Sequence, residues 1–207
     1  MDSREATTYT LTLPVMQKNR NQMKQTFLII ICCVLTSMSF SQNCSDVNTK
    51  IDANFSYVNE SEDLEMPLNK SWNVALENQK AVIVFLQNDS GQATAGIVKN
   101  KNGYHINSAH DIDDNLVVQL IKKMGINLDD RKLSNVKLKN IPAKQIEYNH
   151  KVYNLGDTHL MSGIMYMIVN DGYTYVFMFN STREMKNCYI PYFKNVIKNT
   201  YFGPEWY

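Results

Sequence analysis

IMYMIVNDGYTYVFMF, residues 164–179, holds two apolar runs of β-branched and aromatic side chains around a three-residue turn. Such side chains favour strands, and the runs at 164–169 and 173–179 each have the length of a strand. The turn at 170–172 contains Asp-Gly, and glycine adopts the positive φ that a tight hairpin requires. The stretch therefore predicts a β-hairpin. Both faces of its second strand are apolar, so other elements must cover both faces.

Two helices are predicted to cover this hairpin, one on each face. The first spans 111–124 and follows a capping box that begins at Ser108. Its apolar side chains form one stripe: Ile112, Leu116, Val117, Leu120, Ile121 and Met124. The final helix is predicted to begin at Ser181 with a second capping box, Ser-Thr-Arg-Glu. Pro191 lies inside its apolar pattern and predicts either a kink or the start of a second segment.

Further strand candidates lie before and between these helices. Before the first helix the candidates are the runs at 64–68, 81–86 and 93–98. The turn residues at 88–91 join the last two of these runs into a hairpin. After that helix the candidates are 133–138 and 143–148, separated by a segment that contains Pro142. The predicted order is strand, strand, helix, strands, hairpin, helix.

The run Val136-Lys-Leu-Lys-Asn-Ile-Pro-Ala-Lys-Gln-Ile-Glu-Tyr148 resembles the Gly-x-Pro-Ala-x-x-x-x-Tyr strand of PsbP-like periplasmic proteins and lipoproteins, with Asn140 in place of the glycine. The segment 163–202 is similar to the C-terminal half of that family, and the resemblance extends over 64–202. It implies an α+β fold in which an antiparallel sheet carries helices on both faces, an α/β/α sandwich. It also implies a non-enzymatic accessory or binding role, although fold alone does not assign function.

The N-terminal segment has the composition of an export signal. Lys24 precedes nine apolar residues at 27–35 (FLIIICCVL), and Ser-Phe-Ser at 39–41 supplies small residues for cleavage. We interpret 23–41 as a signal peptide and 1–22 as a possible upstream extension from a misassigned start. A membrane anchor is the alternative, but nine apolar residues are far fewer than the roughly 20 that a bilayer requires. We therefore expect a bacterial protein that is periplasmic or secreted.

The exported chain is predicted to contain a flexible leader, 42–62, followed by a single α+β domain, 63–207. Two cysteines remain after removal of the signal, Cys44 and Cys188. In an oxidising compartment such a pair indicates one disulfide. Two unrelated thiols are the alternative, because the sequence does not show whether the two Cα atoms lie within bonding reach.

Composition and motifs argue against several functions. The formal net charge is +1 and no run of basic residues occurs, so the chain has no electrostatic basis for binding nucleic acid. The cluster HDIDD at 110–114 fails the calcium-loop pattern, because Leu116 and Lys122 stand where glycine and glutamate are required. Methionines near His159 suit a soft copper site, but alternating methionines also pack cores. No nucleophile motif, phosphate loop or dinucleotide turn is present, so we predict no catalytic residue, metal or cofactor.

The sequence therefore predicts a non-enzymatic binding or accessory domain. An envelope enzyme or a metal-binding protein with an unrecognised site is the alternative. The expected partner is an envelope protein or a small apolar ligand, bound near Tyr166, Tyr173 and Tyr175 of the hairpin. Aromatic walls with a few polar tips suit such ligands. The competing outcome is that helices seal both faces of the hairpin and leave no cavity there.

Overall fold

The computed structural model describes residue 44 and residues 49–79, 81–102, 106–123, 126, 128–154 and 157–207. The predicted upstream extension and signal peptide, 1–22 and 23–41, lie outside these residues. Within the described part of the chain, no helix is both long and apolar enough to cross a membrane.

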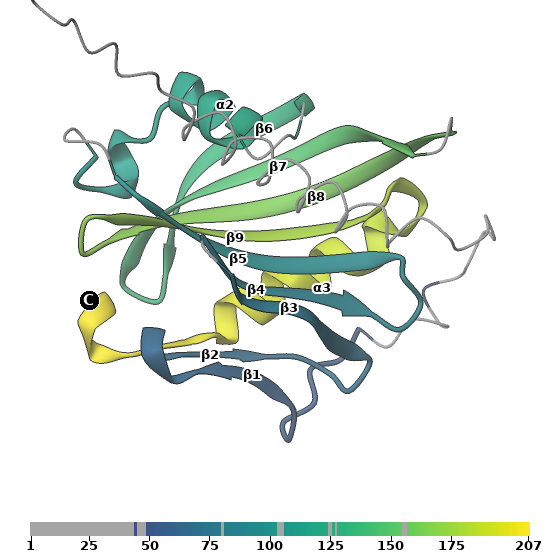
Figure 1. The fold of residues 1–207 in the computed structure, drawn as a ribbon, viewed down its shortest axis with the longest axis horizontal. Helices are drawn as coiled ribbons and strands as arrows, with labels where there is room; N and C mark the ends of the chain where they lie inside the picture. Colours follow the sequence, from purple (N-terminus) through teal and green to yellow (C-terminus); the bar gives the residue numbers. More distant parts are fainter. Residues whose placement is uncertain are drawn as a thin grey trace, which may run out of the picture.

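A seven-stranded antiparallel sheet in the order β3-β4-β5-β9-β8-β7-β6 runs through the centre of the molecule (Figure 1). Its strands are β3 (Trp72–Gln79), β4 (Val82–Asn88), β5 (Ala93–Lys101), β6 (Leu128–Leu138), β7 (Ile141–Asn154), β8 (Asp157–Asn170) and β9 (Tyr173–Thr182). Helices α2 (Asp114–Lys123) and α3 (Lys186–Asn199) lie on opposite faces of this sheet. This is the α+β arrangement that the sequence predicts.

A smaller sheet joins the two ends of the domain. It has the order β1-β2-β10 and consists of β1 (Ser56–Asn59), β2 (Leu64–Pro67) and β10 (Tyr201–Phe202). Two 3-10 turns belong to this region, η2 (Glu60–Glu62) and the C-terminal η5 (Pro204–Trp206). The indole nitrogen of Trp206 donates a hydrogen bond to the carbonyl of Glu62 at 2.8 Å. The last residues of the chain are therefore fixed against its first strands.

The hairpin of β8 and β9 forms as predicted. Ile164 pairs with Phe179, and the register continues to the turn. Asp171 and Gly172 have φ values of 45° and 72°, in the left-handed region that glycine and aspartate tolerate best. The predicted hairpin over 81–98 is also confirmed, since β4 and β5 pair antiparallel.

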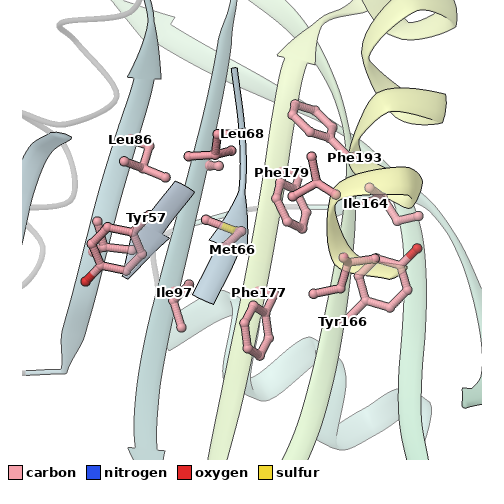
Figure 2. Packing of buried hydrophobic residues seen from close by; sticks show 14 of the residues in the cluster. Tyr57, Met66, Leu68, Leu86, Ile97, Ile164, Tyr166, Phe177, Phe179 and Phe193 are labelled. Carbon is pink, nitrogen blue, oxygen red and sulfur yellow. The ribbon is translucent and has the colours of Figure 1, made fainter. Parts of the chain in front are cut away.

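Each face of the central hairpin is buried by one helix. Toward α3, the hairpin side chains Tyr166, Phe177 and Phe179 share a cluster with Phe193 (Figure 2). The rings of Phe179 and Phe193 stack with centroids 4.8 Å apart. Toward α2, the second cluster consists mainly of Ile112, Val117, Ile121, Met165, Met167, Val176 and Met178. The prediction of one helix on each face is confirmed, because successive residues of a strand point to opposite sides.

The first helix begins later than predicted. Ser108 forms the expected capping box with Asp111, but the box closes a short 3-10 turn, η3 (Ala109–Asp111). Helix α2 starts three residues further on, where the side chain of Asp113 accepts a hydrogen bond from the backbone N–H of Leu116 at 2.7 Å. A second cap thus competes with the first and divides the predicted helix in two.

The capping box predicted at Ser181 is wrong. Ser181 still belongs to β9 and pairs with residues of both β5 and β8, so its backbone takes part in the sheet instead of starting a helix. The 3-10 turn η4 (Arg183–Met185) follows, and α3 then begins without a side-chain cap. Helix α3 continues through Pro191 as one element.

The folded domain starts before residue 63. Residues 56–62, assigned to the flexible leader by the sequence analysis, form β1 and η2, and Tyr57 is buried. Strand β3 was not predicted either; apolar residues stand at its alternate positions 72, 74 and 76, but only Trp72 is buried. Both strands owe their conformation to pairing, β1 with β2 and β3 with β4.

Candidate functional site

A pocket of about 230 Å³ lies between the end of the large sheet and α3. It is lined by residues of β6, β7, β8 and the first turns of α3: Asp130, Arg131, Lys132, Glu147, Tyr148, Asn149, Ser162, Gly163, Lys186 and Ile190. We call it the polar pocket, because most of these side chains carry a charge or a hydrogen-bonding group. Its walls come from segments that are far apart in the sequence and meet through sheet register and helix packing.

Asn149 and Ser162 form the floor of the polar pocket and belong to a row of polar side chains that continues behind it to Ser181. Asn149 of β7 pairs with Ser162 of β8, which pairs with Ser181 of β9. The hydroxyl of Ser162, which is only 1% exposed, donates to Asn149 Oδ1 at 2.7 Å. The hydroxyl of Ser181 is fully buried and has no hydrogen-bond partner in the described part of the chain. Because directly opposed side chains lie about 5 Å apart, this unsatisfied hydroxyl sits beside Ser162 at the inner end of the row.

The charged walls are only partly neutralised. Glu147 forms an ion pair with Lys194 of α3, with Nζ and Oε1 2.6 Å apart. Among the described residues, no ion pair engages Asp130, Lys132 or Lys186. The polar pocket therefore holds two lysines and one aspartate whose charges are available to a ligand.

Arg131 contributes little charge to the polar pocket, although it forms part of the lining. Its guanidinium binds Asp114 of α2 through Nε, 2.7 Å from Oδ1, and through a second nitrogen. Hydrogen bonding to this arginine lowers the pKa of Asp114. Arg131 thus points to the α2 face, as strand alternation requires for a neighbour of Lys132.

Two exposed apolar side chains, Leu160 and Tyr153, form a rim beyond the polar pocket on the β7–β8 hairpin, with Lys151 opposite Leu160. They lie on the same face as Ser162 and Asn149, two and four residues nearer the β7–β8 turn. Their exposed fractions are 38% and 69%, which is high for large apolar side chains. A bound partner that reaches beyond the polar pocket would meet these side chains.

The three tyrosines predicted as a binding site lie elsewhere on the α3 face. Tyr175 is buried beneath Trp206, with ring centroids 4.4 Å apart, and its hydroxyl donates to Glu62 at 2.7 Å. Burial, together with the neighbouring carboxylate of Glu62, raises the pKa of Tyr175 to about 12. Its aromatic face and its hydroxyl are therefore engaged by the chain itself.

The other two predicted tyrosines have separate surroundings. Tyr166 is buried in the α3-side core, and burial with the nearby charge of Glu147 raises its pKa. Tyr173 is partly exposed, and the ammonium of Lys99 lies 4.5 Å from its ring centroid. None of the three lines the polar pocket. A ligand site at these tyrosines remains a prediction.

The polar clusters considered as metal sites have structural roles. Asp111 accepts hydrogen bonds from the backbone N–H groups of Asn107 and Ser108, and Asp113 caps α2. Met165 and Met167 are fully buried in the α2-side core. Within the described residues, no group of three or more His, Cys, Asp or Glu side chains is placed to hold a metal ion.

The structure joins Cys44 to Cys188 by a disulfide, with Cα atoms 5.5 Å apart. Cys188 lies in the buried part of α3. This bond attaches the chain just after the predicted cleavage point to the helix that also forms one wall of the polar pocket.

The comparisons with known proteins concern the fold. No family model and no curated protein matches the chain. The structure is similar to cyanobacterial PsbP (CyanoP) from Synechocystis sp. PCC 6803, with a TM-score of 0.53, 10% identity, and coverage of 72% of this chain and 92% of that one. The chain has the PsbP-like fold. A second PsbP-like match is the Saccharomyces cerevisiae Ran-binding protein Mog1p, with a TM-score of 0.51, 6% identity, and coverage of 74% and 96%.

Proposed function

We propose that this protein is a non-enzymatic binding domain of the bacterial periplasm or the extracellular space, and that the polar pocket is its recognition site. One observation carries the proposal: a pocket whose lysines form no ion pair with any described residue adjoins buried polar groups, among them the hydroxyl of Ser181, which has no hydrogen-bond partner in the same part of the chain. Buried polar atoms without partners cost stability, so their presence beside an open pocket favours a binding role.

Three further observations support this function. The disulfide between Cys44 and Cys188 suits an oxidising compartment outside the cytoplasm. The PsbP-like fold is also that of a protein whose name states protein binding, the Ran-binding protein Mog1p. The exposed rim of Leu160 and Tyr153 suits contact with a protein at the same place.

The compartment is tested by intact-mass analysis of the protein recovered from cell fractions. We expect the mass of a chain that begins at Gln42, recovered from the periplasm or the medium. A full-length product retained in the membrane would contradict this part of the proposal.

The recognition site is tested by photo-cross-linking in living cells. A photoreactive residue at position 186 lies in the wall of the polar pocket, and the same residue at position 198 is exposed on the same helix but outside the pocket. We expect adducts from position 186 and few from position 198. Equal adducts from the two positions, or none from position 186, would refute the polar pocket as the recognition site.

A further inference from the structure

The polar pocket presents more hydrogen-bond donors than acceptors. Lys132 from β6 and Lys186 from α3 line different walls, and neither has an ion-pair partner among the described residues. An ammonium group only donates hydrogen bonds. Two such groups facing one small volume favour an acceptor-rich ligand.

The floor of the polar pocket supplies uncharged hydrogen-bond donors in addition to the lysines. The side-chain oxygen of Asn149 already accepts from Ser162, and no hydrogen bond from its amide nitrogen to a described residue is formed. The amide N–H groups of Asn149 therefore add to the donors of the two lysines.

The polar pocket offers fewer hydrogen-bond acceptors than donors. Glu147 is neutralised by Lys194, so Asp130 is the remaining carboxylate of the lining without an ion pair in the described part of the chain. Two free lysines against one free aspartate leave a positive balance. Arg131, the one arginine of the lining, is held by Asp114 on the other face, so the two lysines supply the positive charge that a ligand would meet.

We infer that the polar pocket binds a small organic carboxylate, held by Lys132 and Lys186 and hydrogen-bonded at its floor by Asn149. This inference rests on the proposed function and names the chemical class of its ligand. The volume of about 230 Å³ fits a molecule of a few carbon atoms, and Ile190 offers a small apolar contact to its carbon chain. Asp130 adds a place for an amino group, so an amino acid belongs to the same class.

The test is isothermal titration of the purified, oxidised protein with acetate, succinate and L-glutamate at constant ionic strength, with inorganic phosphate as the comparison anion. We expect at least one carboxylate to bind with a Kd below about 1 mM, and phosphate to bind at least about tenfold more weakly. Binding of phosphate as tight as that of every carboxylate would overturn the carboxylate class. Absence of heat from all three carboxylates up to about 10 mM would overturn it as well.

Two variants test the assignment to this pocket. Lys132→Ala with Lys186→Ala should weaken the best carboxylate at least about tenfold, because charge-assisted hydrogen bonds are lost. Lys137→Ala with Lys198→Ala is the matched control, since these exposed lysines lie on β6 and α3 but outside the pocket. Equal weakening by both double variants would refute the site.

Asn149→Asp keeps an oxygen that accepts from Ser162 but replaces the amide donor with a carboxylate oxygen, so it should fold normally and weaken the carboxylate roughly threefold or more. Unchanged affinity in this variant would overturn the inferred floor contact. Cross-linking from position 186 without carboxylate binding would leave the binding role in place and refute the ligand class alone.

Discussion

Replacing Gly163 with alanine should destabilise the protein, because there is no room for a side chain at this position. A Cβ built on Gly163 would lie 2.5 Å from Cζ and 2.7 Å from the hydroxyl oxygen of Tyr148, and 2.8 Å from Oδ1 of Asn180. Real Cβ contacts are not this short, so one of these groups must move. Tyr148 is 3% exposed, stacks on His150, and donates its hydroxyl to Asn180 at 2.6 Å.

The expected loss follows from two contributions. Overpacking in a closed core costs about 1–3 kcal/mol. Displacing the ring also breaks the hydrogen bond from Tyr148 to Asn180, for about 1 kcal/mol. The free energy of unfolding should fall by about 2–4 kcal/mol in Gly163→Ala, measured by urea denaturation at neutral pH.

Gly96→Ala is the matched control, because it also replaces a strand glycine. There the new Cβ would lie 3.4 Å from the ring of Phe85, an ordinary contact, so the change in unfolding free energy should stay within about 1 kcal/mol. A double-mutant cycle with Tyr148→Leu identifies the clash. If the tyrosine ring is the obstacle, Gly163→Ala should cost about 1.5 kcal/mol less in the leucine background. Strict additivity, or equal effects at Gly96 and Gly163, would refute the steric explanation.

Three further predictions concern the chain ends and pH. Trp206→Ala should lower the free energy of unfolding by about 3 kcal/mol and Trp206→Phe by about 1 kcal/mol, since only alanine removes the packing on Tyr175. Losses below about 0.5 kcal/mol in urea unfolding would mean that the C-terminus contributes no stability. Reducing the Cys44–Cys188 bond, which closes a separation of 144 residues, should lower stability by up to about 5 kcal/mol, and an unchanged urea midpoint after reduction would contradict this. Burial raises the pKa of both Tyr57 and Tyr175 to about 12, above the unfolded value of about 10. The stability that comes from keeping these hydroxyls protonated is therefore fully present below about pH 10 and is lost as the pH rises through about 12. Replacing both tyrosines with Phe should flatten this fall in the free energy of unfolding.

The local elements could be predicted where the sequence pattern itself encodes them. Alternation of side chains and an Asp-Gly turn specify the β8–β9 hairpin, because both properties act within a few residues. The apolar character of both faces predicts one helix on each side. The Ser108 capping box was also found, although it closes η3 and not α2.

Two elements were missed or predicted wrongly. Strand β3 lies at the edge of the sheet, most of its side chains are exposed, and it pairs with the next strand, β4. At Ser181 a local capping signal was overridden, because sheet pairing on two sides fixes the backbone there. Local preferences of about 1 kcal/mol yield to a ladder of several hydrogen bonds.

The sequence alone determined the central hairpin, the class of the fold and the face on which its tyrosines lie, because side-chain alternation and turn chemistry are local. Only the tertiary structure decided what covers those tyrosines. Glu62 and Trp206, which contact Tyr175, come from opposite ends of the domain, 144 residues apart. The polar pocket arises in the same way, since Lys132, Ser162 and Lys186 each look like ordinary polar residues until strand register and the docking of α3 bring them together.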